Sequence, residues 1–275
     1  MTDKIADLHI HSYYSDGTMS PKEILEAALP RGVGLLTITD HDTLDGTLEL
    51  QELCLGKEVH YITGIELSSL DNVNNTHILG YGINLQDKEF CSFVKRNRIL
   101  LDTVNSMLIE KMQADYDCIS VSDYNAYTYD RTKGGWKALH YLVEKGLTTS
   151  LREGFALYPR YGCTYDCVDF PSVQTVCQNI HKAGGKAVLA HPGVTVKEAD
   201  ITVFENEVLR LISYGIDGIE CYYPTHTEEI TKICLQVCKN HNLLITTGSD
   251  CHGEFGTAEV GEMNIPISML NLAGL

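Results

Sequence analysis

Residues 1–20 read MTDKIADLHIHSYYSDGTMS, and this stretch predicts both the first strand of the fold and the start of a chemical site. Residues 5–10 are mostly apolar and indicate a short buried strand. Side chains alternate between the two faces of a strand, so Asp7, His9 and His11 project to one side, with successive pairs roughly 7 Å apart. Two histidines backed by a carboxylate at this separation have the geometry to hold one metal ion or two neighbouring ions.

The polar face of this strand admits two interpretations. Asp16 follows in a Ser-Asp-Gly turn that can fold back over the same side chains. Buried polar groups without partners are costly, so the two histidines either bind a ligand or form hydrogen bonds within the core. An isolated histidine pair favours the core interpretation. Four later strands also end in ligand-type residues, however, and this favours a metal site.

The composition limits the classes of protein to consider. The chain has 275 residues, 44% hydrophobic and 21% charged, which suits one α/β domain with an insertion or two small domains. We expect no membrane helix, which needs about 18 consecutive apolar residues, and no signal peptide. The ten cysteines form no Cys-x-x-Cys pair. Reduced thiols explain this pattern best, so we expect a cytoplasmic protein.

The net charge argues against one class of partner. The chain carries 37 acidic and 21 basic residues, a formal charge of −16. Such a chain is not suited to binding long duplex nucleic acid, where affinity depends on basic residues that displace counterions. A small phosphorylated substrate is compatible with this charge if bound metal ions invert the local potential.

Seven predicted strands, most of them followed by a helix, organise the chain. The strands span residues 5–10, 33–39, 59–67, 76–81, 186–190, 217–222 and 243–247. This alternation favours the α/β class and a seven-stranded (β/α) barrel over an open sheet.

Residues 86–169 interrupt the alternation. They are richer in charge and tyrosine, and they predict helices at 89–113 and 136–146 without intervening strands. We therefore expect an inserted, mostly helical cap. The predicted boundaries are residues 1–85 and 170–275 for the barrel and 86–169 for the cap.

Nine ligand-type side chains lie at or just after the predicted strand ends, or on the inward face of the first strand. They are His9, His11, Asp16, His41, Glu66, His77, His191, Asp250 and His252. Six of the 11 histidines of the chain fall in this set. Active sites of barrels are built at the carboxyl ends of the strands, so we expect these side chains to converge.

Imidazoles and carboxylates together suit zinc, manganese or iron. Nine ligands exceed what one ion needs and are enough for two or three divalent ions. Closely spaced metal ions hydrolyse phosphate esters through a bridging hydroxide that attacks phosphorus in line. We therefore predict a metal-dependent hydrolase of phosphoric esters.

Several ordered motifs resemble those of the PHP (polymerase and histidinol phosphatase) superfamily. They are Asp-Leu-His-Ile-His-Ser at 7–12, Ser-Asp-Gly at 15–17, Thr-Asp-His-Asp at 39–42, Gly-Ile-Glu at 64–66, Ala-His-Pro at 190–192 and Gly-Ser-Asp-Cys-His at 248–252. Met-Ser-Pro at 19–21 and Gly-Ile-Glu-Cys-Tyr-Tyr-Pro-Thr-His at 218–226 resemble its stand-alone phosphoesterase branch. That branch includes nucleoside 3′,5′-bisphosphate phosphatases and a small-RNA exonuclease.

The resemblance implies a distorted seven-stranded (β/α) barrel with a trinuclear metal site. By this resemblance His9, His11, Glu66 and Asp250 hold one ion, and Glu66 bridges to a second ion held by His77 and His191. Asp16, His41 and His252 hold the third. Asp7, Asp40 and Asp42 fit roles in orienting the histidines by accepting their free N–H groups. For Asp40 and Asp42 simple loop capping is the alternative.

One departure from the family concerns the substrate pocket. The branch commonly carries an Arg-Pro-His motif where this chain reads Lys-Gly-Gly-Trp-Lys at 133–137. Trp136 is a candidate to stack on a base or to anchor the cap core. Lys137 and Arg160 are candidate contacts for a second phosphate, or merely solvated charges. His226 is a candidate for contacting substrate or protonating the leaving oxygen, with helix capping as the alternative.

The leading hypothesis is thus a metal-dependent phosphoesterase that hydrolyses a phosphate monoester or diester of a nucleotide or short oligonucleotide. Histidinol-phosphate phosphatase on the same fold is a second hypothesis, which the insertion and the 218–226 motif disfavour. A third is a metal-binding module without activity, which the intact ligand set disfavours. The sequence names neither the native metal, the substrate nor the oligomeric state.

Overall fold

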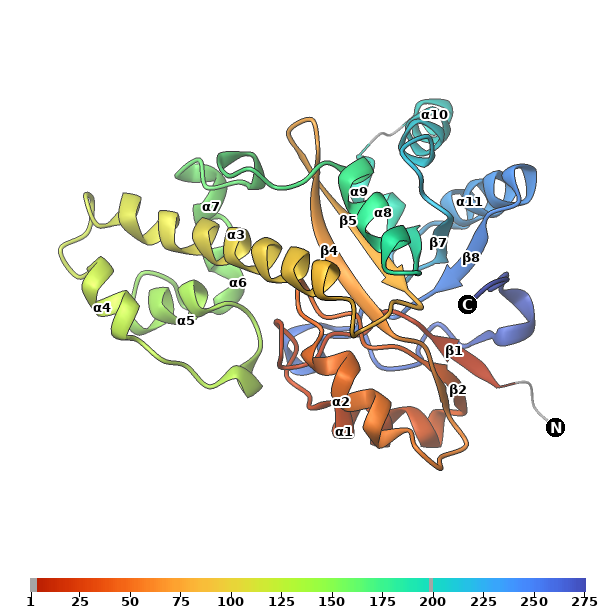
Figure 1. The fold of residues 1–275 in the computed structure, drawn as a ribbon. Helices are drawn as coiled ribbons and strands as arrows, with labels where there is room; N and C mark the ends of the chain where they lie inside the picture. The colour runs from red at the N-terminus through yellow and green to blue at the C-terminus, as the bar shows by residue number, and fades with distance from the viewer. Residues whose placement is uncertain (1–3, 198–199) are drawn as a thin grey trace.

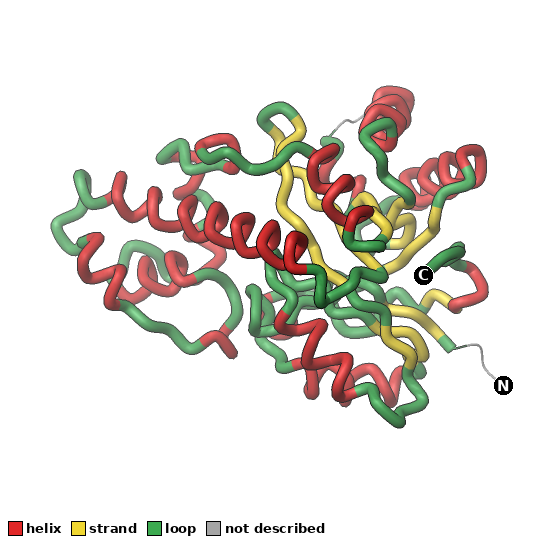
Figure 2. The backbone as a smooth tube through the Cα atoms, viewed as in Figure 1, coloured by secondary structure: helices red, strands yellow, loops and turns green. Residues whose placement is uncertain are grey.

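The computed structural model describes residues 4–197 and 200–275, and its strands form two sheets (Figures 1 and 2). Residues 1–3 and 198–199 of the predicted barrel segments lie outside the described residues. The strands are β1 (Ile5–Asp7), β2 (Val33–Leu36), β3 (His60–Tyr61), β4 (Gly64–Asp71), β5 (Asn74–Tyr81), β6 (Lys186–Leu189), β7 (Gly218–Tyr222), β8 (Leu244–Thr247) and β9 (Ile265–Pro266).

Most of the helices cover the sheets or form the inserted segment. They are α1 (Pro21–Ala28), α2 (Asp45–Leu53), α3 (Lys88–Met112), α4 (Val121–Ala126), α5 (Lys137–Glu144), α6 (Leu151–Gly154), α7 (Leu157–Arg160), α8 (Val173–Lys182), α9 (Pro192–Thr195), α10 (Ile201–Ile212) and α11 (Glu228–His241). Sequence signals fix several of their starts. Ser20 and Glu23 form a reciprocal capping box at α1, with Pro21 at the first position. None of the helices in the described ranges is both long and apolar enough to cross a membrane.

The sheet topology differs from the single barrel of parallel strands expected from the sequence. One sheet has the order β3-β2-β1-β9 and the other the order β4-β5-β6-β7-β8. Strand β5 pairs antiparallel with both β4 and β6, because a tight turn at 72–73 joins β4 directly to β5. The chain therefore has a mixed α/β fold in which the described strands divide into sheets of four and five.

The two sheets are nevertheless joined beyond the ends of their strands. Ile10 bridges to Cys251, which links the chain after β1 to the chain after β8. His41 bridges to Glu66, which links the chain after β2 to β4. These irregular pairings bring the segments that follow β1 and β8 against each other, and the segment that follows β2 against β4.

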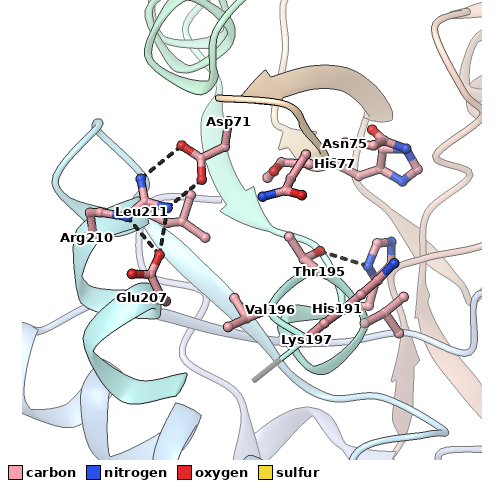
Figure 3. Close-up of a pocket in the computed structure, with 13 residues that line it drawn as sticks. Asp71, Asn75, His77, His191, Thr195, Val196, Lys197, Glu207, Arg210 and Leu211 are labelled. Carbon is pink, nitrogen blue, oxygen red and sulfur yellow. Dashed lines mark hydrogen bonds and ion pairs between the residues drawn. The ribbon is translucent and has the colours of Figure 1, made fainter. Parts of the chain in front are cut away.

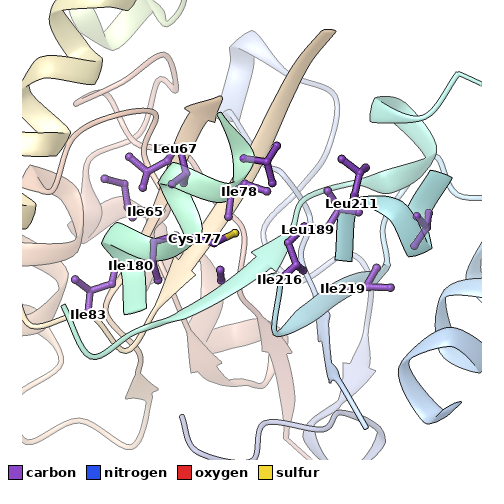
Figure 4. Packing of buried hydrophobic residues seen from close by; sticks show 14 of the residues in the cluster. Ile65, Leu67, Ile78, Ile83, Cys177, Ile180, Leu189, Leu211, Ile216 and Ile219 are labelled. Carbon is purple, nitrogen blue, oxygen red and sulfur yellow. The ribbon is translucent and has the colours of Figure 1, made fainter. Parts of the chain in front are cut away.

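A small apolar cluster fills the space between the sheets. It combines Ala6 of β1 and Leu8 just after β1 with residues of β5, β6 and β8. The Tyr81 hydroxyl donates a hydrogen bond to the Leu8 carbonyl at 2.8 Å, which satisfies the one polar atom of that side chain. Larger clusters lie outside the sheets, and Figure 4 shows the one in which α8 and α10 pack on β4, β5, β6 and β7.

The inserted segment has its own apolar core. Helix α3 joins the two parts: Phe90 and Val94 pack in the sheet cluster, whereas Leu101 and Leu108 pack in a second cluster with α5. In Figure 1 the distal half of α3 extends with α4 to α7 away from the two sheets. The sequence predicts α3 and α5 to within two residues, but not the short helices α4, α6 and α7.

Candidate metal centre

His9 and His11 lie just beyond β1, and both are fully buried. Their side chains share one face of an extended segment, and the two rings converge so that their Nε2 atoms are only 3.1 Å apart. The backbone of Gly248 comes so close that an added Cβ would lie 2.1 Å from the Cβ of His9. Only glycine fits there, so the turn after β8 is shaped to hold His9 in place.

The Glu66 carboxylate lies at the centre of the site. It is 1% exposed and lies on β4, where Glu66 pairs with Leu79 of the antiparallel strand β5. Its Oε1 lies 3.0 Å from both His77 Nδ1 and His191 Nε2. Its Oε2 lies 3.1 Å from His41 Nδ1, 3.2 Å from His11 Nε2 and 3.3 Å from His9 Nε2.

Three overlapping sets of side chains have ligand atoms within 4.8 Å of one another. We call them the Asp250 group (His9, His11 and Asp250), the Glu66 group (His41, Glu66 and His77) and the Asp16 group (His11, Asp16, His41 and His252). His191 reaches the cluster through Glu66. The structure thus brings together all nine side chains that the sequence singled out.

The donor atoms of these groups fit divalent metal ions. Asp16 Oδ1 and His41 Nδ1 are buried, and neither forms a hydrogen bond with any described residue. Buried polar atoms are normally paired, so these two are suited to metal coordination. Imidazole nitrogen and carboxylate oxygen together are ligands for zinc, manganese or iron.

Burial and neighbouring charges set the ionisation of the cluster. Burial opposes ionisation of Glu66, but His77, His41 and His9 hold its pKa well below the usual value. Burial lowers the pKa of His41 to about 3, although Glu66 and Asp16 act in the opposite direction. Its imidazole is therefore neutral at physiological pH, which is the form that binds a metal.

The carboxylates of Asp7, Asp40 and Asp42 have partners other than the imidazoles expected from the resemblance. Asp7 accepts hydrogen bonds from the backbone and hydroxyl of Ser249 and from the Gly261 backbone. Asp40 accepts from Ser12 and Ser15, and Asp42 accepts from Ser68 and Asn97. These three carboxylates therefore brace the loops that carry the ligand-type residues.

Glu220 orients a histidine instead, and the sequence reasoning missed it. It is fully buried on β7, where Oε1 lies 3.0 Å from His9 Nδ1 and Oε2 accepts a hydrogen bond from the His191 backbone at 2.8 Å. A carboxylate only accepts, so the His9 proton is on Nδ1 and Nε2 is free to face the cluster. A single acidic residue inside the apolar strand 218–222 was the available signal.

The candidate substrate contacts fall in different places. Trp136 lies beside the cluster, with its ring centroid 5.9 Å from that of His41. Lys137 instead lies over the Tyr124 ring, and Arg160 is exposed at the end of α7. Both nitrogens of His226 are engaged: Nδ1 lies 3.1 Å from the Cys221 carbonyl and Nε2 accepts from the Gly193 backbone at 3.0 Å.

Two cavities border the cluster. The first, of about 350 Å³, opens beside His77 and His191 and is polar (Figure 3). On its far wall Arg210 forms ion pairs with Asp71 and Glu207, so its charge is already compensated.

The second cavity, of about 490 Å³, borders Asp16, His41 and His77 and reaches the inserted segment. We call it the aromatic cavity, because its lining includes the rings of Trp136, Phe155, Tyr158 and Tyr165. Lys197 and the hairpin residues Asn74 and Asn75 border both cavities and lie between them.

Comparison with known proteins gives the following similarities. A family model described as PHP domain matches residues 7–262. The chain is 29% identical over 261 residues to the phosphoribosyl 1,2-cyclic phosphate 1,2-diphosphodiesterase of Eggerthella lenta, covering 92% of this chain and 95% of the relative. It is 27% identical over 277 residues to the 5′-3′ exoribonuclease of Haemophilus influenzae, covering 95% and 94%. It is 27% identical over 266 residues to the 3′,5′-nucleoside bisphosphate phosphatase of Chromobacterium violaceum, covering 91% and 88%.

A solved structure has the same fold. A Bifidobacterium adolescentis protein assigned to the metal-dependent phosphoesterases superimposes with a TM-score of 0.77 at 25% identity, covering 94% of this chain and 91% of that one.

Proposed function

This chain belongs to the PHP domain family, and from that membership we propose that it is a metal-dependent hydrolase of phosphoric esters. The observation that carries the proposal is the convergence of three ligand groups around one buried carboxylate, Glu66. The names of three relatives support it, because a nucleoside bisphosphate phosphatase, a cyclic phosphate diphosphodiesterase and an exoribonuclease all hydrolyse phosphoric esters.

We assign two or three divalent ions, of manganese, iron or zinc, to the nine side chains. His9, His11, Glu66 and Asp250 would hold one ion. Glu66, His77 and His191 would hold the second, and Asp16, His41 and His252 the third. The Asp16 group has His11 in common with the Asp250 group and His41 in common with the Glu66 group, so the three groups are adjacent.

The residues of the chain prepare the site for this reaction. Bound divalent ions supply an acidified water as nucleophile and neutralise charge on the phosphoryl oxygens. Glu220 fixes the proton of His9 on Nδ1. The Tyr223 hydroxyl donates a hydrogen bond to Asp250 Oδ2 at 2.8 Å and so fixes the rotation of that carboxylate. Pre-set side chains of this kind avoid reorganisation during the reaction.

The substrate is a nucleotide or the end of a short oligonucleotide. The aromatic cavity beside Asp16 and His41 offers Trp136 and Tyr165 as surfaces for a base, because stacking on aromatic rings stabilises bound bases without selecting among them. The polar cavity on the other side of His77 can receive a sugar or a second phosphate near Lys197. With a charge of −16, the chain lacks the basic surface that long duplex nucleic acid requires.

The finer architecture is part of the proposal. We regard the two joined sheets as a distorted barrel and residues 86–169 as its cap, because the cap core is separate and the aromatic cavity lies between the two. All ten cysteines have free thiols, which suits the reducing cytoplasm.

A substrate panel on metal-loaded protein tests the function. With Mn²⁺, we expect hydrolysis of adenosine 3′,5′-bisphosphate or a short 5′-phosphorylated RNA, loss of activity with a chelator, and recovery when Mn²⁺ returns. His9→Ala and Asp250→Ala should abolish turnover, whereas His241→Ala, at an exposed position on α11, should not.

Three results would contradict the proposal in distinct ways. Activity that survives complete metal removal would reject the metal-dependent mechanism. Preference for histidinol phosphate over every nucleotide would support the second hypothesis from the sequence. Bound metal without turnover of any phosphate ester would support the non-catalytic module.

A further inference from the structure

The segment Gly134-Gly135-Trp136 lies between the cap and the ligand cluster, and its backbone adopts a conformation that glycine favours. It joins η2 (Arg131–Lys133) to α5, and both glycines have positive φ, +68° and +67°. A Cβ on Gly134 would lie 2.6 Å from the Cβ of Phe255 and 2.8 Å from the Asp16 carbonyl oxygen. The segment therefore packs closely against two parts of the chain, the backbone of Asp16 and the side chain of Phe255.

The first contact of this segment is with Asp16. The Gly135 N–H donates a hydrogen bond to the Asp16 carbonyl at 2.8 Å. The residue that supplies a carboxylate to the Asp16 group is thus tied through its backbone to the cap.

The second contact is with His41. One face of Trp136 lies under the Arg98 guanidinium, 5.2 Å from the ring centroid, and the ring is 5.9 Å from that of His41. Arg98 also donates a hydrogen bond to the His41 carbonyl at 3.4 Å. Arg98 and Trp136 therefore restrain both the backbone and the ring of His41, and Trp136 is only 9% exposed.

The third contact is indirect and reaches His252. The Phe255 ring lies 6.4 Å from the His252 ring, and it packs against the two glycines. Three of the four members of the Asp16 group are thus backed by this one segment. This segment does not take part in the other contacts of the cluster. Those contacts join Glu66 to His77 and His191, and Asp250 to His9.

We propose that Gly134-Gly135-Trp136 is a positioning element for the Asp16 group, with Trp136 holding His41 in the orientation that binds an ion. The inference deepens the proposed function, because it assumes that the group holds a metal. The cap then contributes to assembly of the metal centre as well as to the wall of the aromatic cavity.

Fluorescence tests the proposal directly, because Trp136 is the only tryptophan in the chain. We would titrate metal-free protein with Mn²⁺, whose unpaired electrons quench nearby fluorophores, and measure bound metal in parallel. Wild-type fluorescence should fall as one ion binds per chain. His252→Ala should remove this response and lower the bound metal by one ion. The matched variant His191→Ala, on the opposite side of Glu66, should keep the response.

Two outcomes of the titration would overturn the inference. One is metal binding in the wild type without a change in Trp136 fluorescence. The other is an equal response in His252→Ala and His191→Ala. If no ion binds at all, the proposed function fails instead, so the two failures are distinguishable.

A second set of variants tests the positioning role. Trp136→Ala should weaken binding of one ion about 10- to 100-fold, as loss of a ligand-orienting partner typically does. Trp136→Phe keeps an aromatic ring and should restore most of that affinity. Lys133→Ala, an exposed neighbour in η2, is the control. Trp136→Ala with unchanged affinity for every ion would contradict the proposal.

Discussion

Replacing Glu220 by glutamine tests how the fold prepares its histidines. The carboxylate accepts from two donors, His9 Nδ1 at 3.0 Å and the His191 backbone N–H at 2.8 Å. An amide has one accepting oxygen and an NH₂ group that only donates. The His191 N–H cannot change, so the amide oxygen stays there and the NH₂ faces His9 Nδ1.

The consequence for His9 is a change of tautomer. Nδ1 must then accept, and the proton moves to Nε2, the atom that lies 3.1 Å from His11 Nε2 and 3.3 Å from Glu66 Oε2. A protonated Nε2 cannot bind a metal. We therefore expect Glu220→Gln to lose metal affinity about 10- to 100-fold, which is about 1.4 to 2.7 kcal/mol.

Calorimetric titration of metal-free protein with Mn²⁺ measures this loss. Activity should follow it, falling at limiting Mn²⁺ and recovering at high Mn²⁺, because the ligands themselves are still present. Glu229→Gln, at an exposed position on α11, is the control and should bind normally. Unchanged affinity in Glu220→Gln would refute the tautomer argument.

Three further predictions concern stability. Gly248→Ala places a Cβ 2.1 Å from the His9 Cβ, so urea unfolding should show a loss of about 3 kcal/mol, and a neutral result would contradict the observed close approach. Mn²⁺ at 100 times its Kd should stabilise the native protein by about 2.7 kcal/mol, seen as a higher Tm that a chelator reverses. In the metal-free protein burial lowers the pKa of His11, but Asp250 and Glu66 raise it from 6.5 to about 10. A folded pKa above the unfolded one gives stability that is complete below pH 6.5 and lost as the pH rises toward 10. If the urea concentration at the midpoint of unfolding rises between pH 6.5 and pH 10, the assignment of a positive charge to His11 is wrong.

Local patterns predicted the ligand-type residues because the strand ends concentrate them. The alternation of Asp7, His9 and His11 and the polar ends of apolar strands required no knowledge of distant contacts. Glu66 and His77 were expected at the ends of parallel strands, yet they lie on the antiparallel pair β4–β5. They still meet, because His77 pairs with Ser68, two residues from Glu66 and on the same face of β4.

The supporting contacts were not predictable in the same way. Asp7 binds Ser249 and Gly261, more than 240 residues further along the chain, and no local pattern encodes such a pairing. The reversal of β5 depends on the turn at 72–73, and the connection between the two sheets depends on bridges such as His41 to Glu66. Trp136 remained ambiguous in the sequence because its role depends on which side chains surround it.

Anomalous diffraction from crystals grown with Mn²⁺ tests the central claim most directly. The account predicts two or three peaks around Glu66, each within bonding distance of one of the ligand groups defined by Asp250, Glu66 and Asp16. Crystals of active protein with no peak near Glu66, or with metal bound only elsewhere, would contradict it.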